Sequence, residues 1–220
     1  MKTVVAQLDS LVGTLVEMLY ALPFAQRLQA GALTREEYAA FLVQTYHYVV
    51  HTRPLLHRAG ERLEQAGQTA LGKLLQQKAN EEDGHDAWLL RDLEAIGESA
   101  DRVRREEPLE PVRAFVAWNE FVVEYGLPVG ILGAAYLLEA VSAQHAGKAA
   151  TNMAAHSAIA GIENGVRFLR GHGDADIEHI AELGHVIEVI GAPPAFREEI
   201  LTTARVTKST YAGMYNALAH

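Results

Sequence analysis

Residue types that bind metal ions gather in the segment GHGDADIEH, residues 171–179. Within it, His172, Asp176 and His179 are spaced i, i+4 and i+7. At roughly 100° per residue, an α-helix places these three side chains on one face, within an arc of about 60°. Two imidazoles and a carboxylate on a common face suit a divalent iron, manganese or zinc ion. The spacing therefore predicts half of a metal site.

Two further elements could supply the other half. Glu82 and His85 are spaced i, i+3, so they share a face if one helix carries both. Paired Glu-x-x-His motifs with separate glutamates build di-iron and di-manganese sites in helical bundles. Glu139 is a lone acid among leucine, alanine and valine, and a buried carboxylate needs a partner such as a metal ion. Together the three elements offer three histidines and three carboxylates, which make a two-metal set.

Each element also has a structural interpretation. Glu82 and His85 could lie on a solvated helix face in a chain with 10 histidines. Asp174 could cap the start of a helix, because aspartate is a favoured N-cap residue. Glu139 could pair with an arginine such as Arg167. The conjunction of all three elements favours the metal interpretation.

The glycines beside His172 bear on how this segment folds. Gly171 and Gly173 each cost a helix about 1 kcal/mol relative to alanine. Asp174, Asp176 and Glu178 also repel one another unless a cation is present. We therefore expect helices over 158–170 and 174–190, and a segment around His172 and Asp176 that is only marginally helical, and irregular without a metal ion.

The composition narrows the classes of function. Formal net charge is −9 and the pI is about 5.6, which argues against a broad nucleic-acid-binding face and against an anionic membrane surface as partner. With 0 cysteines, thiolate zinc sites and a cysteine nucleophile are excluded. Glycines and a proline interrupt the most apolar stretch, residues 126–143, so we expect no membrane span and a cytoplasmic protein.

Hydrophobic periodicity is helical nearly throughout the chain. Thr34 and Glu37 form a capping box at the start of one helix, and Pro54 marks a kink or an end within it. Further helices are expected over Thr69–Ile96, 111–125 and 129–144, and from the GAPP turn at 191–194 to the end. No strand-like alternation occurs. The pattern predicts an all-α, single-domain bundle of seven to eight helices over residues 1–220.

The order and separation of these motifs resemble those of the heme-oxygenase-like di-iron oxidases and oxygenases, over most of the chain. The segment at 22–49, LPFAQRLQAGALTREEYAAFLVQTYHYV, is similar to the start of the superfamily that includes heme oxygenase, thiaminase II and pyrroloquinoline-quinone synthase. The resemblance implies a heme-oxygenase-like fold. The ligands that it implies are Glu82, His85, Glu139, His172, Asp176 and His179, with Glu81 as the alternative to Glu82.

The resemblance also implies a function. Two ferrous ions, or an iron–manganese pair, would activate dioxygen to oxidise a small organic substrate: a fatty acid, an amino acid or an amine. An external reductant and a homodimer are expected, and Tyr46 and His47 are the pocket candidates. The alternative is a metal-free ligand-binding or cofactor-maturation protein, similar to the quinone synthase. Against the other relatives, thiaminase II needs a cysteine, and a heme oxygenase needs a histidine earlier in the chain than His47, the first one here.

Overall fold

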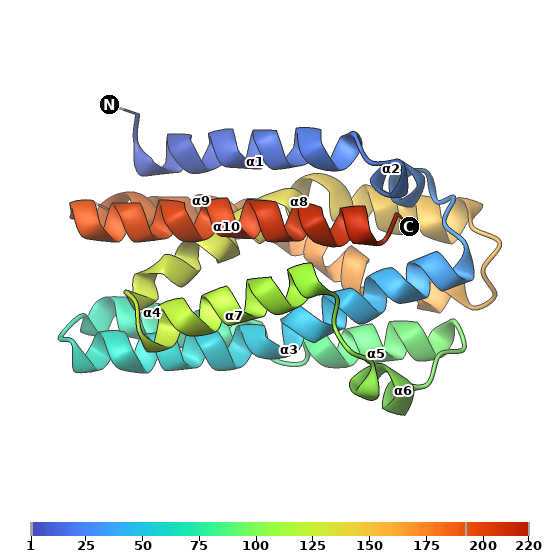
Figure 1. Cartoon of the computed structure of the whole chain (residues 1–220), viewed down its shortest axis with the longest axis horizontal. Coiled ribbons are helices and arrows are strands. Elements are labelled where there is room, and N and C mark those ends of the chain that lie inside the picture. Colours follow the sequence, from blue (N-terminus) through green and yellow to red (C-terminus); the bar gives the residue numbers. More distant parts are fainter. Residues whose placement is uncertain (1, 192, 220) are drawn as a thin grey trace.

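The chain folds into a bundle of helices (Figure 1). The computed structural model describes residues 2–191 and 193–219, except the side chains of residues 174–179. In this part of the chain there are ten α-helices, two 3-10 helices and no strand. The helices are α1 (Val4–Tyr20), α2 (Pro23–Ala30), α3 (Arg35–Gln65), α4 (Thr69–Glu81), α5 (His85–Ala95), α6 (Ala100–Arg105), α7 (Glu110–Glu124), η1 (Pro128–Gly130), α8 (Ile131–His156), η2 (Ile162–Asn164), α9 (Arg167–Ile190) and α10 (Pro194–Ala217).

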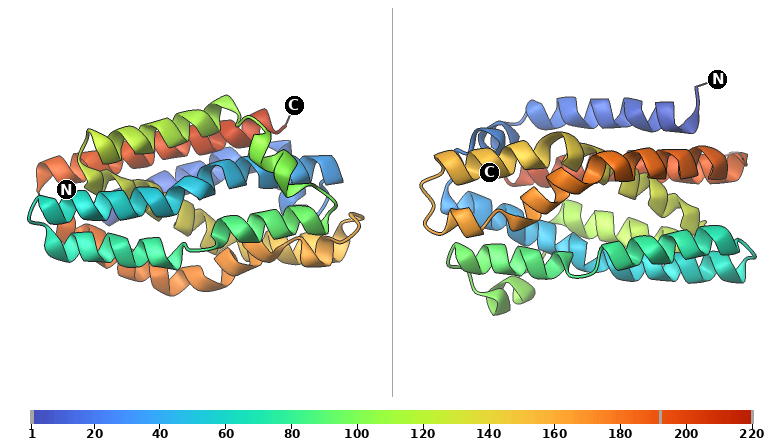
Figure 2. Two further views of the ribbon diagram at one scale, coloured as in Figure 1. Left: turned by 90° about the horizontal axis from the view of Figure 1, so that it is seen from below. Right: turned by 180° about the vertical axis from the view of Figure 1, so that it is seen from behind.

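The helices pack mostly along one another. α8 packs along α9, α3 packs along α4, and α10 contacts α1, α7 and α8. Seen from below in Figure 2, α9 runs beside α5. Among the described helices none is by itself long and apolar enough to cross a membrane; α1 and α2 reach that length and composition only as a pair bent by 89°.

The all-α prediction is confirmed, but the predicted count of seven to eight helices is too low. The helix expected over Thr69–Ile96 is broken at Gly84, whose φ of 84° ends α4 and starts α5. Two short helices, α2 and α6, form in segments to which no helix was assigned from the sequence. Pro54 does not end α3, which continues to Gln65.

The expected break between residues 170 and 174 is wrong, because α9 continues through it. The two glycines allow close packing there. A Cβ at Gly171 would lie 2.6 Å from the Trp88 ring, and one at Gly173 would lie 2.4 Å from the backbone nitrogen of Gly147. The close packing of α9 on α5 and α8 thus offsets the low helix propensity of the two glycines.

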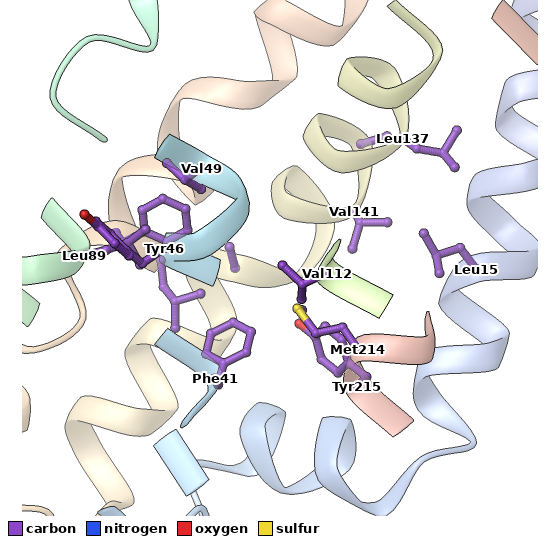
Figure 3. Close-up of a cluster of buried hydrophobic side chains, with 14 of the residues drawn as sticks. Leu15, Phe41, Tyr46, Val49, Leu89, Val112, Leu137, Val141, Met214 and Tyr215 are labelled. Carbon is purple, nitrogen blue, oxygen red and sulfur yellow. The ribbon is translucent and has the colours of Figure 1, made fainter. Parts of the chain in front are cut away.

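One continuous cluster of buried apolar side chains forms the core. Figure 3 shows Leu15 of α1, Phe41 of α3, Leu137 of α8 and Tyr215 of α10 within it. The start of α3 is fixed by the predicted capping box: Thr34 Oγ1 accepts from the Glu37 amide at 3.2 Å, and Glu37 Oε2 accepts from the Thr34 amide at 2.9 Å.

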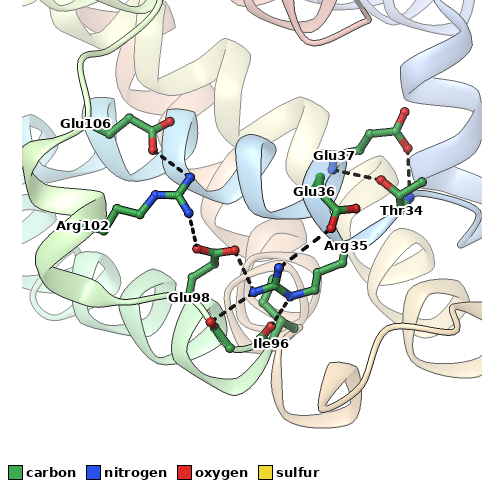
Figure 4. A network of polar contacts seen from close by, with 9 residues as sticks. Thr34, Arg35, Glu36, Glu37, Ile96, Glu98, Arg102 and Glu106 are labelled. Atoms are coloured by element: carbon green, nitrogen blue, oxygen red, sulfur yellow. Dashed lines mark hydrogen bonds and ion pairs between the residues drawn. The ribbon is translucent and has the colours of Figure 1, made fainter.

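A polar network ties this end of α3 to the segment after α5 (Figure 4). Arg35 donates to the carbonyls of Ile96, at 2.7 Å, and Gly97, at 3.1 Å. Its guanidinium also lies 2.9 Å from Glu98, which in turn pairs with Arg102. The backbone carbonyls at the end of α5 therefore have a fixed partner.

Asp92 holds the start of α9 against α5. Its carboxylate is fully buried and accepts hydrogen bonds from the amides of Arg167, at 3.0 Å, and Phe168, at 2.8 Å. These are orphan donors of the first helical turn. Burial raises the pKa of Asp92 to about 6, although the two amides and the arginines Arg167 and Arg170 lower it.

Replacing Gly173 by alanine tests the close contact between α8 and α9. Because backbone atoms cannot rotate away from the new Cβ, the two helices must separate, and we expect a loss of about 1–3 kcal/mol in the free energy of unfolding by urea titration. Gly13→Ala is the matched control, since an added Cβ there meets nothing within 4 Å. It should stabilise α1 by about 0.5–1 kcal/mol. Equal effects of the two changes would contradict the close contact.

The raised pKa of Asp92 predicts a pH dependence of stability. The usual pKa is 3.8 and the folded value is about 6, so the folded state binds the Asp92 proton more tightly than the unfolded state does. The stability that protonation of Asp92 contributes is therefore complete below pH 3.8 and is lost as the pH rises through 6. The free energy of unfolding should fall by about 3 kcal/mol over that range relative to Asp92→Asn. Parallel urea titrations at several pH values measure it, and an identical pH dependence in the two proteins would contradict the assignment.

Candidate metal centre and its cavity

Glu82, His85 and His172 converge from three helices. Their ligand atoms all lie within 4.8 Å of one another, and all three residues are partly buried. Glu82 follows the last residue of α4, His85 opens α5, and His172 lies one turn into α9. Carboxylate and imidazole donors at this spacing fit a bound divalent metal ion.

A turn, rather than an unbroken helix, brings Glu82 to His85. Glu82 caps α4 with helical backbone angles, and Gly84 then takes a left-handed conformation. The α-helix is therefore interrupted by a short turn before α5 begins, and the His85 side chain meets Glu82 at 2.9 Å between Nδ1 and Oε2. The predicted Glu-x-x-His pairing is observed, with a local geometry that its helical spacing did not predict.

The backbone fixes the proton on His172. Its Nδ1 lies 2.9 Å from the carbonyl oxygen of Phe168, which can only accept, so Nδ1 donates and Nε2 of the neutral ring keeps its lone pair. Burial lowers the pKa of His172, and the neighbouring His85 lowers it further. A neutral imidazole oriented by a backbone carbonyl is the usual form of a metal-binding histidine.

Aromatic rings hold the two imidazoles in place. The His172 ring lies 4.1 Å from the Phe168 ring and 4.7 Å from the His85 ring, between centroids. Trp88 lies 4.5 Å from the His85 ring on its own helix. Because Gly171 leaves room for Trp88, α9 can bring His172 this close to α5.

Glu139 enters the same region from α8. It lines one cavity with Glu82 and His172, and so does Lys78. The Lys78 ammonium lies 2.8 Å from Glu81. Burial lowers the pKa of Lys78, but Glu81 and Glu139 outweigh it and raise the value.

This arrangement bears on two alternatives from the sequence. The cation close to Glu139 is Lys78, whereas Arg167 is exposed at the start of α9. Glu81 is engaged by Lys78 and accepts from Gln77 at 3.1 Å, while Glu82 faces His85. Two of the predicted ligands, Asp176 and His179, lie outside the described residues, as does Asp174.

The cavity has a volume of about 140 Å³ and mostly apolar walls. Its apolar lining comes from Leu28, Phe41, Val49, Leu55, Leu56, Leu75, Phe115, Ile131, Leu132, Ala134, Ala135, Leu138, Val141, Ala146, Ala149, Phe168, Leu169 and Leu183. Its polar lining comes from Gln29, Tyr48, Thr52, Lys78, Glu82, Asn119, Glu139, Ser142, His145, His172, Tyr211 and Tyr215. Such a cavity suits a small organic molecule with few polar groups.

Among the described residues, the wall contains Tyr48 rather than the pocket candidates Tyr46 and His47. Tyr46 is buried in the core, and burial lowers the pKa of His47. Helical spacing could have pointed to Tyr48, since it lies seven residues from both Phe41 and Leu55, which also line the cavity. No sequence signal singled out Lys78 or Asn119.

Solved structures resemble this fold closely. A domain of unknown function with a heme oxygenase-like fold from Shewanella denitrificans OS217 aligns with a TM-score of 0.82 at 19% identity, over 96% of this chain and 89% of that one. A TenA homolog from Pseudomonas syringae pv. tomato DC3000 aligns with a TM-score of 0.78 at 15% identity, over 97% and 90% of the two chains. A CADD-like protein of unknown function from Nostoc punctiforme PCC 73102 gives 0.70 at 20% identity, over 97% of both.

Sequence comparison gives the family. No curated protein matches the chain. A family described as iron-containing redox enzymes matches residues 39–210, most of the chain and all of the candidate ligands. The fold and this match agree: the chain belongs to the family of iron-containing redox enzymes with the heme oxygenase-like fold.

Proposed function

We propose that the protein is a non-heme di-iron oxidase or oxygenase that activates dioxygen to oxidise a small organic substrate. The observation that carries the proposal is the convergence of Glu82, His85 and His172 within 4.8 Å, beside an apolar cavity that Glu139 also lines. Membership of a family of iron-containing redox enzymes supports it. Imidazole and carboxylate donors together suit iron.

In this proposal each candidate ligand has a role. Glu82, His85, Glu139 and His172 bind the two ions, and Asp176 and His179 complete the set. Ferrous ions bound there supply the electrons with which dioxygen is reduced; an iron–manganese pair is the alternative composition. His172 is held in the ligating tautomer by the Phe168 carbonyl, so it binds an ion through Nε2 without first losing a proton.

The cavity walls would bind the substrate. Their apolar side chains exclude water and bind the carbon skeleton of the substrate next to Glu139 and His172. Of the substrates that the resemblance implies, such walls favour an apolar chain over a short, highly charged amino acid. An external reductant, a cytoplasmic location and a homodimer complete the proposal.

A metal-free ligand-binding protein is the second candidate. One observation favours it: His85 is paired with Glu82 at 2.9 Å and His172 with a backbone carbonyl at 2.9 Å, so both rings have hydrogen-bond partners without a metal ion. The same cavity, which His172 lines, would then bind the ligand. Ferrous binding separates the two candidates.

Anaerobic ferrous titration tests the proposal. The wild type should bind two ferrous ions per chain and consume dioxygen on mixing, whereas His172→Ala should lose at least tenfold in metal affinity, because a buried ligand is removed. His156→Ala is the matched control, since His156 is exposed at the end of α8. Absence of ferrous binding by the wild type would favour the metal-free candidate.

The position of Lys78 makes a separate prediction. Its ammonium lies in the cavity wall close to Glu139 and opposes a cation bound there. Lys78→Met should therefore raise ferrous affinity by about tenfold, measured by competition with a chelator. Lys73→Met, which changes an exposed lysine of the same helix, should have no effect. Unchanged binding by Lys78→Met would contradict the opposition, and weaker binding would show that the lysine supports the site.

A further inference from the structure

A buried polar side chain on α7 lines the cavity. Asn119 lines the wall, and only 2% of the residue is exposed. α7 packs on α3 and α10, whereas α4, which carries Lys78, packs on α3. Asn119 therefore enters the cavity from a different helix than any of the candidate ligands.

The orientation of the Asn119 amide is fixed. Its Nδ2 donates to the carbonyl oxygen of Phe115 at 2.9 Å. That oxygen can only accept, so the amide cannot be flipped and Oδ1 must be the free end. Among the described residues, none donates a hydrogen bond to this buried oxygen.

An amide oxygen in this state is costly. A buried polar atom without a partner destabilises a protein, and native structures hold few of them. Because Asn119 lines the cavity, a molecule bound there can supply the missing donor.

We infer that Asn119 Oδ1 accepts a hydrogen bond from a neutral hydroxyl group of the substrate. The assignment deepens the proposed function, on which it rests, by adding a hydroxyl to an otherwise apolar substrate. A neutral donor is required because a buried ammonium needs a counter-charge. The carboxylates in the wall, Glu82 and Glu139, are candidate metal ligands, and Glu120 beside Asn119 pairs with Arg58.

Two isomers test the inference directly. 1-Heptanol and hexyl methyl ether have the same number of heavy atoms, and only the alcohol donates a hydrogen bond. Each is titrated into full-length, isotope-labelled protein after removal of metal by chelation, and the side-chain amide resonance of Asn119 is followed by NMR. The alcohol should bind about fivefold more tightly than the ether, the difference expected for one hydrogen bond. 1-Heptylamine, charged at neutral pH, should bind more weakly than the alcohol.

Asn119→Leu keeps a similar volume and removes the acceptor. It should bind the alcohol and the ether equally, with its affinity for the ether unchanged. Equal affinities in the wild type would overturn the inference and leave a bound water as the partner of Asn119, and this comparison needs no variant to fold. If 1-heptylamine bound more tightly than both the alcohol and the ether, the assignment of a neutral donor would be overturned. Because no iron is present, failure here and failure of the ferrous titration are independent results.

Discussion

The position of His172 depends on how α9 is held against α5. Asp92 accepts the first two amides of α9, and Gly171 allows the helix to rest on Trp88. His85 lies on the same helix as Asp92 and Trp88, so one rigid element carries both the anchor of α9 and a candidate ligand. The distance between the two imidazoles is thereby set by buried contacts. A carboxylate whose pKa is raised by burial is the cost of that arrangement.

The second constraint is the break in the helix at Gly84. α4 ends at Glu81, and the left-handed glycine directly precedes a new helix that begins at His85. The end of α4 and the start of α5 thereby present Glu82 and His85 at one place. Glu139 then needs only to face this place from α8. The cavity extends from it between the helices, with mostly apolar walls.

Some of this could be predicted from the sequence and some could not. The helical class followed from periodicity. The closeness of Glu82 and His85 was predicted from a shared helix face, but a turn produces it. The break at Gly84 was not predicted, because an isolated glycine in a helical pattern is more often tolerated. Gly171 and Gly173 were interpreted through propensity alone, yet their role is close contact with Trp88 and Gly147, residues distant in sequence. For the same reason the positions of Lys78 and Asn119 in the cavity wall became evident only from the packed helices.

The most direct test of a two-metal centre is anomalous diffraction at the iron edge from crystals grown with ferrous iron. Two peaks are expected, each at an ion bound among Glu82, His85, Glu139, His172, Asp176 and His179. No peak at these residues, or a single ion bound elsewhere on the chain, would contradict it.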